Sequence, residues 1–289
     1  MKNYFKAELV TEYSLKTALY LLLPLFILYA VFFIYPLSRL FTISLFQPDI
    51  GFTLENYHHF FREPVYSKIL FRTVRVSIMV ALVCLVTGYP IAFALSRARG
   101  RKLSIYLGCI ILPFWMSILV RNYAWTVILQ RNGVINNFLE WLGIIDSPLK
   151  LLYTDLSVII GMVHYLLPFM VLPLFTVLKQ IDPTLQLAAH NLGAKPMQTF
   201  LRVTFPLSLP GVGAGILFVF IIGLGFFITP ALLGGPNNLM LSTLIERQIL
   251  NNNWPFGAAI AVILLLVAIV FIAIFNRMAG FDKIFGGDL

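Results

Sequence analysis

The sequence has few charged residues. Asp, Glu, Lys and Arg make up 11% of its 289 residues, whereas soluble domains carry about 25%. Hydrophobic residues account for 60%, and the mean hydropathy is +0.89. Uncharged apolar stretches recur, each long enough to cross a bilayer with roughly 20 residues. This composition excludes a soluble domain and predicts an all-α protein that crosses a membrane several times.

Cysteine and metal-ligand patterns are also scarce. The two cysteines, Cys84 and Cys109, lie inside apolar stretches, which indicates free buried thiols rather than disulfides. His58 and His59 lie in a predicted loop, while His164 and His190 stand alone. We therefore expect no metal site, because metal sites need ligands at characteristic spacings.

The sequence offers no machinery for catalysis or for its own energy supply. It contains no G-x-x-x-x-G-K-[ST] loop, so it cannot hold ATP in a P-loop of its own. No serine, histidine and acid pattern suggests hydrolysis, and we expect no catalytic residue. All twelve Asp and Glu residues fall outside or at the edges of the apolar stretches. Because ion-coupled carriers keep acidic groups at membrane depth, a transported solute would need energy from another subunit.

Six apolar stretches predict six membrane spans in one membrane domain over 1–289, with a core of about 70–278. The predicted spans are about 17–37, 74–95, 103–129, 156–178, 207–233 and 256–275. Pro113 and Arg121 interrupt the third. Five glycines in the fifth indicate close helix contacts, at 211, 213, 215, 223 and 225.

Basic residues set the expected orientation. Four of them crowd six positions with no acid: Arg97, Arg99, Arg101 and Lys102. Positive loops remain in the cytoplasm, and an even number of spans then places both termini there. This orientation leaves 12 of the 21 basic residues inside, so the dense cluster decides it. Topology and membrane lipid explain the net charge of +9, and we expect no nucleic-acid partner.

Residues 182–206, DPTLQLAAHNLGAKPMQTFLRVTFP, predict two short amphipathic helices between the fourth and fifth spans. Asp182 followed by Pro183 is typical of a helix start, and Gly193 of a helix end. Pro196 then begins the second helix. Each helix has one apolar face, formed by Leu185, Ala188, Ala189 and Leu192 in the first and by Met197, Phe200, Leu201 and Phe205 in the second. Such a pair is suited to docking, although a helix lying on lipid headgroups has the same pattern.

The same segment resembles the EAA loop of ABC importer permeases, which reads E-A-A, three residues, G, nine residues, I-x-L-P. Ala188, Ala189, Gly193 and Pro206 match this pattern. Val203 and Phe205 replace its isoleucine and leucine. Leu187 stands where the family usually has glutamate.

Other motifs are similar to those of spermidine/putrescine-type permease subunits and extend the resemblance over most of the chain from residue 70. They are G-Y-P-I-A at 88–92, L-P-F-W at 112–115, V-R-N-Y-A-W at 120–125, G-V-I-N at 133–136, L-L-P-F-M at 166–170 and N-W-P-F-G-A-A at 253–259.

The resemblance implies a type I permease fold and a transport subunit of a bacterial inner-membrane ABC importer for a small polar solute. A polyamine is favoured, and another small solute remains an alternative. The implied partners are a homodimer of ATP-binding subunits that carries ATP and Mg, a second related permease, and an external solute-binding protein. A stand-alone ion-coupled carrier and a non-transporting scaffold are the rival interpretations.

The resemblance also implies an ATPase-coupling role for six residues: Gln186, Leu187, Ala188, Ala189, Gly193 and Pro206. Since Leu187 lacks the usual charge, either apolar contact carries more of this interface or Gln186 supplies a hydrogen bond.

Candidate pathway residues gather around an arginine in the third span: Trp115, Arg121, Tyr123, Trp125 and Tyr165. A charge at membrane depth is costly unless it is paired or solvated. Arg121 therefore either faces a translocation path or extends to the outer headgroups within an aromatic belt. We expect His164 to be a hydrogen-bonded packing residue.

Overall fold

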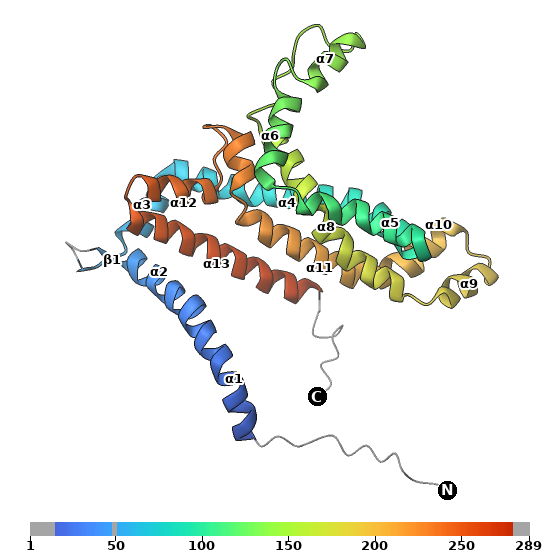
Figure 1. The fold of residues 1–289 in the computed structure, drawn as a ribbon, viewed down its shortest axis with the longest axis horizontal. Helices are drawn as coiled ribbons and strands as arrows, with labels where there is room; N and C mark the ends of the chain where they lie inside the picture. The colour runs from blue at the N-terminus through green and yellow to red at the C-terminus, as the bar shows by residue number, and fades with distance from the viewer. Residues whose placement is uncertain (1–14, 48–50, 280–289) are drawn as a thin grey trace.

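The structure, a computed structural model, describes residues 15–47 and 51–279 and is an elongated bundle of long helices (Figure 1). Its elements are α1 Leu15–Tyr29, η1 Ala30–Ile34, α2 Tyr35–Leu45, β1 Phe46–Gln47, β2 Gly51–Phe52, α3 Glu55–Arg62, α4 Pro64–Arg97, α5 Gly100–Ile111, η2 Leu112–Trp115, α6 Ile118–Leu129, α7 Val134–Trp141, α8 Asp155–Gln180, α9 Pro183–Asn191, α10 Pro196–Thr199, η3 Phe200–Thr204, α11 Phe205–Leu224, η4 Pro230–Gly234, α12 Leu241–Leu250 and α13 Trp254–Ala279. The two short strands pair antiparallel in a small hairpin.

Five helical stretches in the described residues are long and apolar enough to cross a membrane. They are Leu19–Leu45, Pro64–Arg97, Asp155–Gln180, Pro196–Leu224 and Trp254–Arg277. A sixth crossing is possible only if a bent pair of helices, 100–115 and 118–141, counts as one span. Five of the predicted spans therefore overlap continuous helices, and the third does not.

The third span is interrupted at Pro113, as predicted, whereas Arg121 lies inside the continuous helix α6. The segment before residue 116 and the segment after it meet at 93°. Pro113 lies in the 3-10 turn η2, and Met116 and Ser117 both have non-helical backbone conformations. Two consecutive non-helical residues redirect the chain, so α6 and α7 leave the bundle as a projecting limb (Figure 1).

The fifth span was placed incorrectly at both ends. Its helix starts at Pro196 and passes through the π-helical turn η3 without a break. It ends at Leu224 rather than at 233, since Gly225–Phe227 are not helical. The short π-helical segment η4 then folds back against α8: a Cβ on Gly161 would lie 2.6 Å from side-chain atoms of Thr229 and Leu233.

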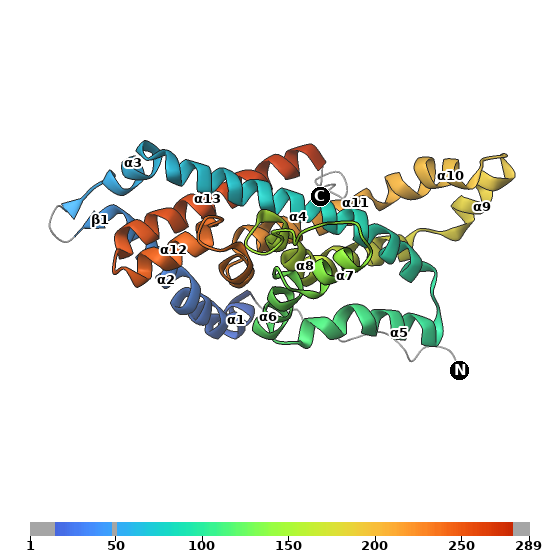
Figure 2. The same cartoon turned by 90° about the horizontal axis from the view of Figure 1, so that it is seen from above.

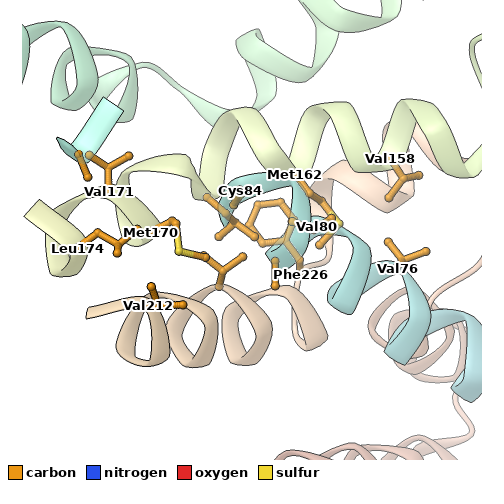
Figure 3. Close-up of a cluster of buried hydrophobic side chains, with 14 of the residues drawn as sticks. Val76, Val80, Cys84, Val158, Met162, Met170, Val171, Leu174, Val212 and Phe226 are labelled. Carbon is orange, nitrogen blue, oxygen red and sulfur yellow. The ribbon is translucent and has the colours of Figure 1, made fainter. Parts of the chain in front are cut away.

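The main core lies where α4, α8 and α11 pack together. Figure 3 shows apolar side chains from the three helices pointing toward one another, among them Cys84, Met170 and Val212. Cys84 and Met170 are fully buried. A second cluster, around Phe60 and Phe256, joins α3, α12 and the first turns of α4 and α13.

Two of the predicted glycine contacts are real. An added Cβ on Gly211 would lie 3.2 Å from the Leu174 Cα atom and from the Pro173 oxygen. On Gly215 it would lie 2.5 Å from the Met170 sulfur. On Gly225, in contrast, an added Cβ would meet only the Ile222 oxygen, at 4.0 Å. Glycine lets the backbones of α8 and α11 approach closely, as in other membrane helix pairs.

The bundle has two distinct ends. The α12 end carries α3, α12 and an ion pair in which Arg72 and Asp155 lie 3.5 Å apart. The α9 end carries the α4–α5 turn together with α9 and α10, which extend beyond the bundle (Figure 2). The first span is the most detached: its membrane-crossing window is 0% buried, and it meets α13 through α2.

We predict that Gly211→Ala destabilises the protein by about 1–3 kcal/mol, because the new methyl group overpacks against the α8 backbone. Gly108→Ala is the matched control, since a Cβ at Gly108 on α5 meets no atom within 4 Å. Thermal unfolding in detergent, followed by size-exclusion fluorescence, measures the difference. Equal melting temperatures for the two variants would contradict the packing described here.

Candidate functional site

Residues 182–206 form a structured element, which we name the α9–α10 arm. The Asp182 carboxylate accepts a 2.9 Å hydrogen bond from the Thr184 N–H, and Pro183 occupies the first helical position, as predicted. Bonds from the Thr184 N–H and then its hydroxyl lower the pKa of Asp182. The carboxylate therefore stays ionised, and its capping contribution is lost only as the pH falls through that lowered pKa.

A sharp turn separates the two helices of the arm. Gly193 has a φ of +82°, a conformation that residues with a side chain rarely adopt. The Ala194 N–H bonds to the Ala189 oxygen at 3.0 Å and closes the end of α9. The Gln198 side chain accepts from the Lys195 N–H at 3.0 Å and opens α10. Local bonds thus fix the angle between the helices.

Aromatic contacts fix the arm to the bundle. The Phe200 ring meets Tyr89 and Phe93 of α4 at centroid distances of 5.7 and 5.8 Å. The Tyr89 hydroxyl lies 2.8 Å from the Ser208 hydroxyl, one turn into α11. The second predicted apolar face is therefore divided: Phe200 packs inward, while Met197 and Leu201 remain 67% and 53% exposed.

The outer surface of the arm is apolar and uncovered. Leu187 is 62% exposed, and Leu192 at the turn is 88% exposed. A groove of about 590 Å³ runs between α9 and η3, with Leu187 and Met197 in its lining. Ala188 and Pro206 are exposed, and Ala189 is half-buried.

Gln186 faces the inside of the arm. Its side-chain amide lies 3.4 Å from the hydroxyl of buried Thr204, and the residue is only partly exposed. Of the six predicted coupling residues, it alone is directed toward the bundle by a hydrogen bond. This placement favours the apolar alternative for Leu187 over a hydrogen bond from Gln186.

The second group of predicted residues lies at the break in the third span. Arg121 is 4% exposed, so its side chain is buried within the protein. Its guanidinium donates to the Pro113 oxygen and, at 3.4 Å, to the Met116 oxygen. It also lies over the Tyr165 ring, 5.2 Å from the centroid. Two backbone carbonyls at the break thus accept hydrogen bonds from the buried guanidinium, an arrangement that favours the interior position of Arg121 over one among the headgroups.

Of the other four predicted pathway residues, Tyr165 contacts this arginine directly and Trp125 contacts His164, the neighbour of Tyr165 in the chain. The Trp125 ring nitrogen donates to the His164 Nδ1 atom at 3.0 Å, so the expected hydrogen bond of His164 is present, but the residue is exposed rather than packed in the interior. Tyr165 contacts Phe226 of the segment after α11. The other two predicted residues, Trp115 and Tyr123, are 85% and 71% exposed.

The described residues contain no group of three His, Cys, Asp or Glu side chains that could hold a metal ion. The structure instead offers two features: an exposed arm that is joined to α8 and α11, and a buried arginine at a helix break.

Comparison with known proteins identifies the family. Residues 17–280 match the family described as the binding-protein-dependent transport system inner membrane component. The chain belongs to this family. With five continuous apolar helices and a broken one, it is a multi-pass inner-membrane protein of type I permease fold.

Its relatives are transport subunits. The chain is 40% identical over 227 residues to the spermidine/putrescine transport system permease protein PotB of Salmonella typhimurium, a match that covers 78% of this chain and 79% of that protein. The PotB of Haemophilus influenzae is 37% identical, with the same coverage. A crystal structure of a bacterial alginate ABC transporter, in complex with an alginate-bound periplasmic protein, superimposes with a TM-score of 0.74. That match is 22% identical and covers 91% of this chain and 93% of the other. This similarity to the alginate transporter supports the type I permease fold.

We predict that Arg121→Met loosens the helix break, because the Pro113 and Met116 carbonyls lose their donor. Cys109 is an exposed thiol on α5 and Cys84 is buried, so a spin label on Cys109 pairs with a second label at Val127→Cys on α6. The distance distribution between the labels should broaden. Arg131→Met, which alters an exposed arginine after α6, is the control and should leave the distribution unchanged. Equal widths in all three proteins would show that Arg121 does not hold the break.

Proposed function

We propose that the chain is a permease subunit of an ATP-driven importer and forms part of the translocation pathway for a polyamine. The observation that carries the proposal is the rigid, exposed α9–α10 arm on a chain whose relatives include PotB at 40% identity. The subunit itself performs no bond chemistry. ATP and Mg would be held by a homodimer of ATP-binding partner subunits.

In the proposed orientation, the α9 end of the bundle faces the cytoplasm. The loop with Arg99 and the α9–α10 arm lie at the same end (Figure 2), as the positive-inside rule requires if both are cytoplasmic. Both termini then lie in the cytoplasm as well. A second, related permease would complete the pathway, and an external binding protein would deliver the solute at the α12 end.

The arm suits the transmission of force. It follows α8 after two residues and continues into α11 without a break. Movement of a docked ATPase would therefore move two packed spans together as a rigid body, which is a common form of conformational switching. The coupling contact would be apolar, formed by residues such as Leu187, Leu192 and Met197, because the usual glutamate is absent.

Aromatic side chains would recognise a polyamine within the membrane. Ammonium groups are attracted to aromatic faces, and Phe114, Tyr165 and Phe169 form one connected group of rings. Within the continuous spans no carboxylate is available except near an end, at Asp155. Trp115 and Tyr123, being exposed, are available to face a second permease across the pathway.

The proposal is tested in proteoliposomes that contain this chain together with its neighbouring permease, ATP-binding and binding-protein subunits. We expect uptake of labelled spermidine or putrescine only when ATP is supplied inside the vesicles. Uptake by the chain alone under an ion gradient would favour a secondary carrier. Failure of the chain to co-purify with any ATP-binding subunit would favour a scaffold.

We predict that Gly193→Val reduces solute-stimulated ATP hydrolysis, because a β-branched residue at φ +82° adds about 1–2 kcal/mol of strain and changes the angle of the arm. Gly143→Val is the matched control: Gly143 follows α7, has a φ of +67°, and likewise has no atom within 4 Å of an added Cβ. Hydrolysis that survives the first substitution as well as the second would count against coupling through the arm.

A further inference from the structure

The root of the α9–α10 arm contains a cavity that the proposed transport function does not use. Its volume is about 550 Å³. The ends of α4 and α8, the turn before α5, the start of α9 and the last residue of η3 line it. Five segments of the chain therefore converge on this space, and the arm is one of them.

The lining is strongly basic. Arg97, Arg99 and Lys179 contribute three positive charges, and no Asp or Glu lines the cavity. Within the described parts of the chain, none of the three has an ion-pair partner. Ser96 and Thr204 add hydroxyl groups. Such a set of donors without an acid fits a phosphate group.

Two of the cations are held by rings on their own helices. The Arg97 guanidinium lies 4.1 Å from the centroid of Phe93, and the Lys179 ammonium lies 5.2 Å from the centroid of Phe175. Each pair has the i, i+4 spacing that places side chains on one helix face. Both cations also lie at the carboxyl ends of long helices, where positive charge is favoured.

The depth of the cavity argues for a lipid rather than a protein partner. Arg97 ends the α4 span, and Lys179 lies in the last turn of the α8 span, so in the proposed orientation both lie at headgroup level. The surface suited to the ATP-binding subunit lies farther out, at the turn with Leu192. Basic pockets between spans on the cytoplasmic side are typical lipid-headgroup sites.

The remaining lining suits the body of a lipid. Leu103, Leu178 and Ile181 provide apolar surface beside the basic groups. Helix α5 has no buried residue and stands apart from the arm in the view from above (Figure 2). A phospholipid could therefore enter sideways, with its phosphate toward the cations and its acyl chains along α5.

Topology alone does not explain this convergence. Arg101 and Lys102 belong to the same basic run as Arg99 and serve the positive-inside rule equally well, yet they do not line the cavity. Lys179 comes from a different segment of the chain, 80 residues after Arg99 in the sequence. The cations that line the cavity are thus a selected subset.

We propose that this cavity binds the phosphate group of an anionic phospholipid from the cytoplasmic leaflet and that the bound lipid braces the root of the arm. The inference rests on the proposed orientation and coupling role. Bound lipid would join the α4–α5 turn to α9, so that movement of the arm is passed to the spans instead of being lost at the connection after α8.

The test compares the double variant Arg99→Gln/Lys179→Gln with the matched double variant Arg101→Gln/Lys102→Gln. Both remove two positive charges from the same end. The full-length chain, alone and with its partner subunits, is placed in nanodiscs of phosphatidylcholine with or without phosphatidylglycerol, and retained lipid is counted by native mass spectrometry. We expect phosphatidylglycerol to be retained by the wild type and the matched variant. The cavity variant should retain it about 25-fold less well, at about fivefold for each basic residue.

The second readout is ATP hydrolysis by the assembled complex. Phosphatidylglycerol should stimulate the wild type and the matched variant but not the cavity variant. Equal lipid retention by the two variants would overturn the proposal, as would equal stimulation by inorganic phosphate in phosphatidylcholine discs. Loss of the ATP-binding subunit from the cavity variant in phosphatidylcholine alone would assign the cations to a protein contact instead. Lipid retention is counted on the chain itself. The lipid proposal can therefore be supported or overturned whether or not the complex transports a polyamine.

Discussion

The close packing of α8 against α11 is the constraint on which the rest of the structure depends. Gly211 and Gly215 bring the two backbones together, and an added methyl group at either position would meet α8 at 3.2 Å or less. The α9–α10 arm joins these same two helices. An element attached to one mobile helix would only bend it, whereas an element attached to a tightly packed pair can move both.

The second constraint is the low dielectric of the membrane, which determines where polar groups lie. Asp182 is at the solvated end of the bundle, where it caps α9. Among the described residues, Arg121 is the one charged side chain that is buried, and it lies beside the broken third span. Backbone carbonyls at the break accept hydrogen bonds from its guanidinium, so they can solvate the buried charge. The broken helix and the buried arginine are therefore two parts of one arrangement.

The α9–α10 arm could be predicted closely from sequence because its signals are local: Asp182–Pro183 at a helix start, Gly193 at a turn and Pro196 at a restart each impose their own backbone conformation. The break after Pro113 could not be predicted with the same certainty. Pro90, Pro168 and Pro173 lie inside continuous helices, so a proline in an apolar stretch does not by itself indicate a break. The early end of α11 depends on the packing of η4 against α8, which is a contact between distant residues.

In the candidate sites, too, features set by local sequence could be predicted and features set by distant contacts could not. The predicted coupling residues come from the family resemblance, and of these six only Gln186 is directed toward the bundle by a hydrogen bond. The cluster around Arg121 was expected in composition but not in geometry, because its partners are backbone atoms, which leave no trace in a residue pattern. The basic cavity was not predicted at all. Its one local signal is a phenylalanine four residues before each of two cations, at Phe93–Arg97 and Phe175–Lys179.

The central claim is that the turn of the α9–α10 arm contacts an ATP-binding subunit, and site-specific photo-crosslinking tests it most directly. A photoreactive phenylalanine derivative replaces Leu192, which is 88% exposed, or Trp141, which is 79% exposed on α7. Both proteins are expressed with their neighbouring transport subunits and irradiated in membranes. The account predicts that the ATP-binding subunit is captured from position 192 and not from position 141. Capture from position 141 alone, or capture of only lipid from position 192, would contradict it.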